Sequence, residues 1–166
     1  MNEGVEWALH SCLNLAWTGG ERAVTAARLA AYHDLPAAYL NKQLQALVRA
    51  GILGSVSGPR GGFRLARPLD RITLMDVVTA IEGPEEAFRC TEIRAQGPGG
   101  GAGDGGGGGG GVEVPAVECA IAGAMARAEL AWRRELAART LEDVRREAER
   151  QAPGAPDRIR RWIATA

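Results

Sequence analysis

Two short helical segments followed at once by a glycine-tipped hairpin constrain the fold of this chain more than any other feature. Residues 26–33 and 36–49 have apolar side chains at helical spacing, and Asp34-Leu35-Pro36 breaks the chain between them. Residues 52–65 read ILGSVSGPRGGFRL, in which an apolar pair, a glycine-rich turn and an alternating strand predict a β-hairpin. A helix-turn-helix followed by such a hairpin is a winged helix, so we predict a mainly α fold with a small β-hairpin wing.

More helices are expected around this unit. Residues 5–17 and 72–82 have helical spacing, and residues 119–138 are strong helix formers that precede a short helix ending near residue 150. Residues 157–164 are expected to add one turn. The apolar side of the long helix needs a partner, and the simplest one is the same helix in a second copy of the chain. Packing inside the chain is the alternative.

The predicted elements suggest four parts of the chain. They are a winged-helix domain over residues 1–83, a ligand loop over residues 84–118, a dimerisation helix with a following short helix over residues 119–150, and a tail over residues 151–166. Residues 97–111 of the loop contain 12 of the 23 glycines. No Lys-Ser/Thr pair follows them, so we interpret the tract as a flexible loop and not as a phosphate-binding loop.

Charge is distributed unevenly along a chain whose 20 basic and 20 acidic residues cancel. Residues 22–71 contain eight basic and two acidic residues, a net charge of +6, whereas residues 1–21 and 72–166 each carry −3. A basic block is typical of proteins that bind a polyanion, although taken alone it also fits a solvated face. Because this block coincides with the predicted winged helix, we predict double-stranded DNA as a partner.

The start of the second short helix and the hairpin tip are the segments expected to contact DNA. Polar side chains of a recognition helix read base edges in the major groove, and a wing touches the backbone or the minor groove. A dimer would bind a pseudo-palindromic operator. The candidate contacts are Thr25, Tyr39, Asn41, Lys42, Gln43, Ser57 and Arg60.

Other classes of protein are not expected. No run approaches the roughly 18 apolar residues of a transmembrane helix, and the acidic N-terminus lacks the apolar core of a signal peptide, so a cytoplasmic location is predicted. No nucleophile–base set is visible, which argues against an enzyme.

Cys12, Cys90 and Cys119 are too few for a disulfide framework and are interpreted as thiols or metal ligands. Cys12 lies on the apolar side of the first helix and is interpreted as a buried hydrophobe.

Three segments carry a resemblance to a known family: YLNKQLQALVRAGIL at residues 39–53, SVSGPRGGFRLARP at residues 55–68 and ITLMDVVTAIEG at residues 72–83. In them the chain resembles the bacterial Rrf-two family, which contains IscR, NsrR and RsrR. The resemblance covers residues 5–150 and implies a homodimeric winged-helix regulator of transcription. Many members bind an iron–sulfur cluster, usually through three loop cysteines. This chain departs from that pattern, because its loop region offers only Cys90 and Cys119.

Two side chains of the first helix are candidates for the missing ligands. Glu6 and His10 are four residues apart and point from one helix face, although this spacing also fits a surface ion pair. The sequence around them, together with that around Cys90 and Cys119, resembles redox-sensing members of the family. This resemblance implies a [2Fe–2S] cluster held by Cys90 and Cys119 of one subunit and by Glu6 and His10 of the other.

Trp7 lies in sequence between the two candidate helical ligands. A change of charge at the cluster would repack its ring and move the first helix together with the recognition helix, which makes Trp7 a candidate redox relay. Ordinary core packing is the alternative interpretation of Trp7.

Other functions stay open for the whole protein. They are a cluster-free regulator controlled by a metabolite or a protein partner, a nitric-oxide-responsive cluster regulator, and an iron–sulfur electron carrier.

Overall fold

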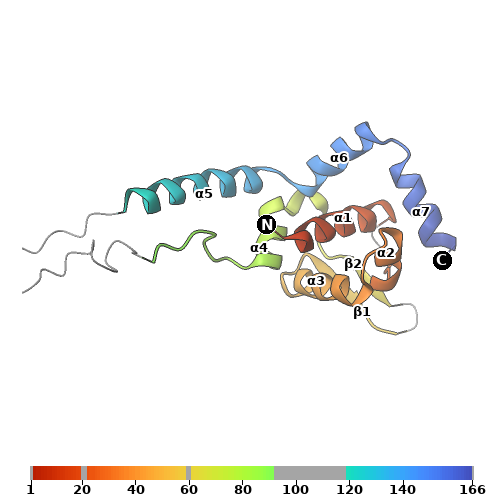
Figure 1. Cartoon of the computed structure of the whole chain (residues 1–166). Coiled ribbons are helices and arrows are strands. Elements are labelled where there is room, and N and C mark those ends of the chain that lie inside the picture. The colour runs from red at the N-terminus through yellow and green to blue at the C-terminus, as the bar shows by residue number, and fades with distance from the viewer. Residues whose placement is uncertain (1, 20–21, 59–60, 92–118, 166) are drawn as a thin grey trace, which may run out of the picture. The chain divides into compact units, whose positions relative to one another are not determined.

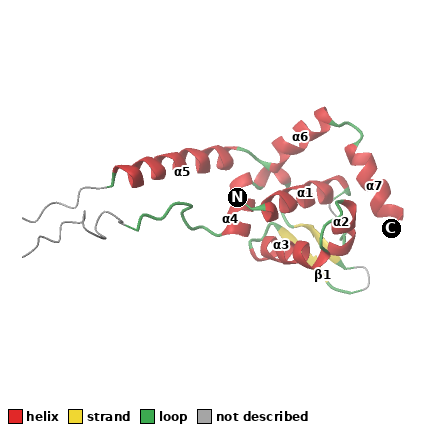
Figure 2. Ribbon diagram, in the orientation of Figure 1, coloured by secondary structure: helices red, strands yellow, loops and turns green. Residues whose placement is uncertain are grey.

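The computed structural model describes residues 2–19, 22–58, 61–91 and 119–165. Contacts divide the chain into two compact units, residues 1–85 with 133–166 and residues 86–132. The first unit is mainly helical and contains a two-stranded antiparallel sheet, which confirms the predicted winged helix (Figures 1 and 2). Its elements are α1 (Glu3–Trp17), α2 (Ala26–Tyr32), α3 (Ala37–Arg49), β1 (Leu53–Val56), β2 (Gly62–Leu65), η1 (Leu69–Arg71), α4 (Leu74–Glu82), α6 (Leu141–Gln151) and α7 (Ala155–Thr165).

The helix-turn-helix is formed by α2 and α3. Thr25 caps α2, because its Oγ1 accepts a hydrogen bond from the backbone N–H of Arg28 at 3.2 Å. Asp34 has a φ of 53°, a left-handed conformation that turns the chain after α2. Leu29 of α2 and Leu40 of α3 are fully buried in one core. Burial of each leucine stabilises the fold by about 1.5–3 kcal/mol, and the two helices are held together mainly by this core.

The wing is a hairpin attached to the start of α2. β1 and β2 pair in antiparallel register with Ser55 opposite Phe63. Phe63 also pairs with Val24, through backbone hydrogen bonds of 2.9 and 2.8 Å. Gly62 has a φ of 145°, and a Cβ at this position would lie 2.4 Å from the Val24 carbonyl. Only glycine fits there, so the wing depends on Gly62 for its attachment to the helix-turn-helix.

Two helices of the first unit, α4 and α6, each begin with a capping box. Thr73 and Asp76 begin α4 with reciprocal hydrogen bonds of 3.0 and 2.9 Å. Thr140 and Asp143 begin α6 in the same way. Thr73 and Thr140 also form a β-bridge, so the starts of α4 and α6 are tied together. Figure 1 shows α1 between α3 and α6, and both helices contact it.

The C-terminal helix α7 is longer than the sequence analysis predicted. The expectation of a single turn over residues 157–164 is wrong, since α7 runs over 11 residues. The reason is tertiary: Ile159 and Ile163, four residues apart, are buried in the core of the winged helix. α7 contacts both α1 and α2.

The long helix α5 (Ala120–Ala138) begins in the second unit and ends in the first. None of its residues is buried, and Ile121 and Met125, which lie on one side of the helix, are 66% and 42% exposed. The prediction of a partner helix was based on this apolar side of α5, and the structure leaves it exposed. Within the described ranges, no helix combines the length and the apolar character that crossing a membrane requires.

Candidate DNA-binding surface and cluster ligands

The first two turns of α3 present a polar face. Asn41 and Lys42 are exposed, and Tyr39 is 43% exposed, whereas Leu40 and Leu44 on the opposite side are fully buried. This division follows from the 3.6-residue period of the helix. The exposed face thus carries an amide and an ammonium group, which can donate hydrogen bonds to base edges or phosphates.

Gln43 does not belong to this exposed face. Its side chain is only 7% exposed and lies beside Gly4 of α1, where a Cβ would come within 3.0 Å of Gln43 Cδ. The helix period places Gln43 at the edge of the buried stripe, next to Leu40 and Leu47. The structure therefore disagrees with its prediction as a DNA contact and assigns it to the packing of α3 on α1.

The remaining predicted contacts lie before α2 and on the wing. Thr25 is exposed, but its hydroxyl oxygen is engaged as the cap of α2. Ser57 is exposed directly after β1. Arg60 lies outside the described residues.

Glu6 and His10 are exposed on one face of α1 and border a cavity of about 520 Å³. Val5, Leu9 and Leu13, with Val144 of α6, contribute apolar side chains to the same cavity, which Asn2 and Glu3 also line. A carboxylate and an imidazole are thus placed at the border of a largely apolar cavity, where a segment of another chain could approach them.

His10 has a neighbour that sequence reasoning did not find. Its ring centroid lies 5.6 Å from that of His33, whose Nε2 is 2.8 Å from Nδ2 of Asn14. Partial burial, followed by the electrostatic effect of His10, lowers the pKa of His33. The hydrogen bond to Asn14 gives His33 a structural role.

The three cysteines have different environments. Cys12 is completely buried in the core, which confirms its interpretation as a small hydrophobe. Burial raises its pKa to about 12, so that it stays a thiol at neutral pH and is a poor metal ligand. Cys90 is exposed and Cys119 is 8% exposed, and both belong to the second unit.

The side chains that could bind a [2Fe–2S] cluster form two separate pairs. Neither pair alone is a complete site. Among the described residues, no group of three or more His, Cys, Asp and Glu side chains could hold a metal ion. One pair, Glu6 and His10, is on the first unit, and the other, Cys90 and Cys119, is on the second. Thiolates and an imidazole are established types of ligand for such clusters.

Trp7 connects α1 to α3. Its half-buried ring stacks edge-on against Tyr39, with centroids 5.1 Å apart and an interplanar angle of 77°. The contact joins a residue between the two candidate ligands to a candidate DNA contact. Both Trp7 and Tyr39 were candidates from the sequence, but their contact could not be predicted from it.

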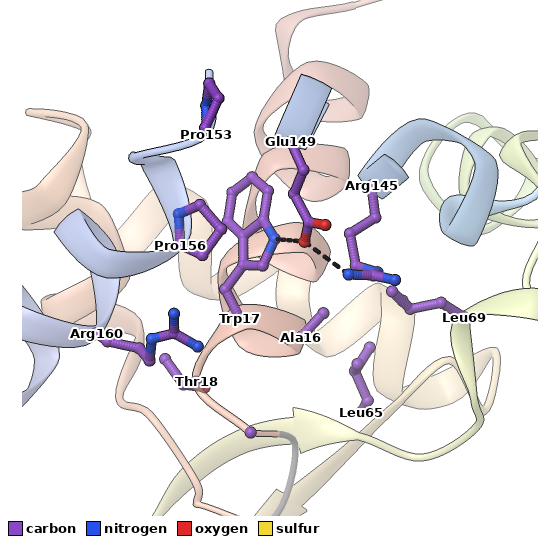
Figure 3. A pocket seen from close by; sticks show the side chains of 11 residues that line it. Ala16, Trp17, Thr18, Leu65, Leu69, Arg145, Glu149, Pro153, Pro156 and Arg160 are labelled. Atoms are coloured by element: carbon purple, nitrogen blue, oxygen red, sulfur yellow. Dashed lines mark hydrogen bonds and ion pairs between the residues drawn. The ribbon is translucent and has the colours of Figure 1, made fainter. Parts of the chain in front are cut away.

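A second cavity, of about 700 Å³, lies between the end of α1 and the helices α6 and α7 (Figure 3). Trp17 Nε1 donates to Glu149 Oε1 at 2.8 Å, and Arg145 donates to the same oxygen at 2.6 Å. Arg145 also binds Glu142, and this hydrogen bond lowers the pKa of Glu142. Since these polar groups satisfy one another, we interpret the cavity as a junction of helices and assign no ligand to it.

The helix-turn-helix, its wing and the polar face of α3 define a winged-helix protein of the class that binds DNA. Residues 1–147 match the Rrf2 family, described as iron-dependent transcriptional regulators, and the chain belongs to this family.

Relatives and solved structures agree with this assignment. The chain is 36% identical over 70 residues to the HTH-type transcriptional regulator IscR of Cereibacter sphaeroides, covering 42% of this chain and 45% of that protein. It is 34% identical over 80 residues to protein rrf2 of Nitratidesulfovibrio vulgaris, with 48% and 53% covered. The chain thus spans about half the length of the curated relatives it matches.

Two solved structures share the fold. CymR, the global cysteine regulator of B. subtilis, has a TM-score of 0.65 at 23% identity, covering 89% of this chain and 96% of CymR. T. potens IscR has a TM-score of 0.64 at 20% identity, covering 92% and 90%. Sequence identities this low show that the fold is shared. They do not indicate which cofactor this chain binds.

Proposed function

We propose that this protein regulates transcription as a homodimer whose affinity for DNA responds to the redox state of a [2Fe–2S] cluster. Glu6 and His10 of one subunit and Cys90 and Cys119 of the other would hold the cluster. The observation that carries this proposal is the position of Glu6 and His10, exposed at a cavity on the helix that packs on the recognition helix.

DNA binding is proposed to involve α3 and the wing. Asn41 and Lys42 would enter the major groove with Tyr39 at their side, while Ser57 and Arg60 would meet the backbone. Glycines beside Arg60 allow the wing to approach a phosphate closely. The exposed apolar side chains of α5 would be covered by a second copy of the chain.

Redox state would be transmitted through α1. When bound, the cluster would supply a one-electron couple. Glu6 would hold it through a carboxylate and His10 through an imidazole, so that a change in its charge would act on α1. Trp7, in contact with Tyr39, is placed to turn a small movement of α1 into a movement of α3.

Replacing Trp7 with alanine should uncouple DNA affinity from redox state. In the wild type we expect the oxidised and reduced proteins to differ in Kd for the operator, and in the variant their ratio should approach one. The measurement is fluorescence anisotropy with both redox states under anaerobic conditions. Trp7→Phe is the control, because it keeps a ring against Tyr39 and limits the loss of core packing. An unchanged ratio in Trp7→Ala would remove Trp7 from the mechanism.

The first test of the proposed function combines spectroscopy with DNA binding. Ultraviolet–visible and electron paramagnetic resonance spectra of anaerobically purified protein should show a reducible [2Fe–2S] centre, and the same sample should bind duplex DNA. A colourless protein after reconstitution would favour a cluster-free regulator controlled by a metabolite or partner. A [4Fe–4S] centre that reacts with nitric oxide would favour a nitric-oxide sensor. A cluster without any DNA binding would favour an electron carrier.

A further inference from the structure

The C-terminal helix α7 places basic side chains beside the first helix of the helix-turn-helix. The family match ends at residue 147, so α7 lies beyond it. Residues 155–165 contain three arginines and one aspartate, a net charge of +2. α7 belongs to the same compact unit as the winged helix and contacts α2.

The contacts fix which ends of α7 and α2 meet. Trp162 Nε1 donates to the backbone oxygen of Arg28 at 3.4 Å, and the Trp162 ring lies 5.9 Å from that of Tyr32. Arg28 Nη1 in turn donates to the backbone oxygen of Ile163 at 3.3 Å. Since Arg28 is in the first turn of α2 and Tyr32 is its last residue, the C-terminal end of α7 lies along this short helix, including the N-terminal end of α2.

The arginines of α7 differ in their position around the helix. At about 100° per residue, Arg161 falls opposite the isoleucine stripe, on the side turned away from the core, whereas Arg158 falls beside Trp162, on the side that faces α2. Arg160 falls on the other side, where it lines the cavity of Figure 3 and pairs with Asp157 at 2.6 Å. Arg158 and Arg161 are exposed, and within the described part of the chain no ion pair engages either one.

We propose that Arg158 and Arg161 contact the phosphate backbone of duplex DNA next to the base pairs that α3 reads. This inference rests on the proposed DNA binding. In helix-turn-helix proteins the first helix crosses the DNA backbone. A helix beside the N-terminal end of α2 is therefore near phosphates, and guanidinium groups bind phosphate oxygens by charge-assisted hydrogen bonds.

The experiment measures how the affinity of the full-length protein for DNA depends on salt. A fluorescein-labelled duplex, selected from a random library by the wild type, is titrated at several KCl concentrations. We expect Arg158→Ala with Arg161→Ala to lower the slope of log K against log [KCl] by about 0.9 for each phosphate that is no longer neutralised, or about 1.8 per subunit. The double replacement by lysine should recover most of the slope, because the charge is kept.

The matched control removes the same charge from α6. Arg146 and Arg150 are exposed and ion-paired, and α6 lies on the side of α1 away from α3, so Arg146→Ala with Arg150→Ala should leave the slope unchanged. If the α7 variant keeps the wild-type slope while Lys42→Ala weakens binding, the α7 contact is overturned and DNA binding through α3 stands. If the wild type selects no duplex, the proposed function fails and this inference with it.

Discussion

Replacing His10 with alanine should abolish the [2Fe–2S] signal of the anaerobically purified protein or shift it measurably. His10 is exposed at the border of an apolar cavity, one turn from Glu6, where donors from a second subunit could complete a site. Alanine would remove one of four proposed ligands, and a three-ligand site holds such a cluster poorly. The readouts are the visible absorption of the oxidised protein and the electron paramagnetic resonance spectrum after reduction.

His33→Gln is the control for this prediction. The two rings lie 5.6 Å apart, so both replacements remove an imidazole from the same part of the surface. His33 differs because its Nε2 is hydrogen-bonded to Asn14, and the glutamine amide can replace that bond. We expect the control to keep the cluster spectrum. A spectrum that is lost in His33→Gln and kept in His10→Ala would transfer the ligand role to His33. A cluster unaffected by either change would place the missing ligands elsewhere.

The elements that could be predicted from sequence are those with local determinants. The capping box of Thr73 and Asp76 needs only residues three apart, and it begins a helix in the segment where helical spacing predicted one. The hairpin required glycine at its tip, and Gly62 adopts a φ of 145° that favours glycine. The burial of Cys12 followed from the helical period of α1. In each case short-range chemistry alone decides the outcome.

The features that sequence reasoning missed depend on contacts between distant segments. Gln43 is polar and lies on the recognition helix, but α1 covers it at Gly4. α7 exceeds one turn because the core formed by α1 and α2 accepts Ile159 and Ile163. No local pattern indicates which surface will receive a helix, so such packing overrides propensity. The proposed ligand pairs are a further case, since donors contributed by two subunits leave no common spacing in one sequence.

Removing the cations of Lys42 and Arg60 should weaken DNA binding more than the loss of any other two charges in the basic block. Lys42 is exposed on the polar face of α3, and Arg60 stands in the glycine-rich sequence between the two strands. A good contact to a base contributes about 1–3 kcal/mol, and each phosphate contact adds about 0.9 to the salt slope. We expect the double alanine variant to bind the selected duplex about tenfold or more weakly and to show a flatter salt dependence.

The control tests whether position or net charge is responsible. Arg49 and Arg71 are exposed members of the same +6 block, at the end of α3 and in η1, so Arg49→Ala with Arg71→Ala removes an equal charge elsewhere. If long-range attraction alone recruited DNA, both double variants would lose affinity to the same extent. If α3 and the wing dock on the duplex as proposed, the Lys42 and Arg60 variant loses far more and also relaxes its sequence preference. Equal losses would leave the basic block with long-range attraction alone and remove the proposed docking geometry.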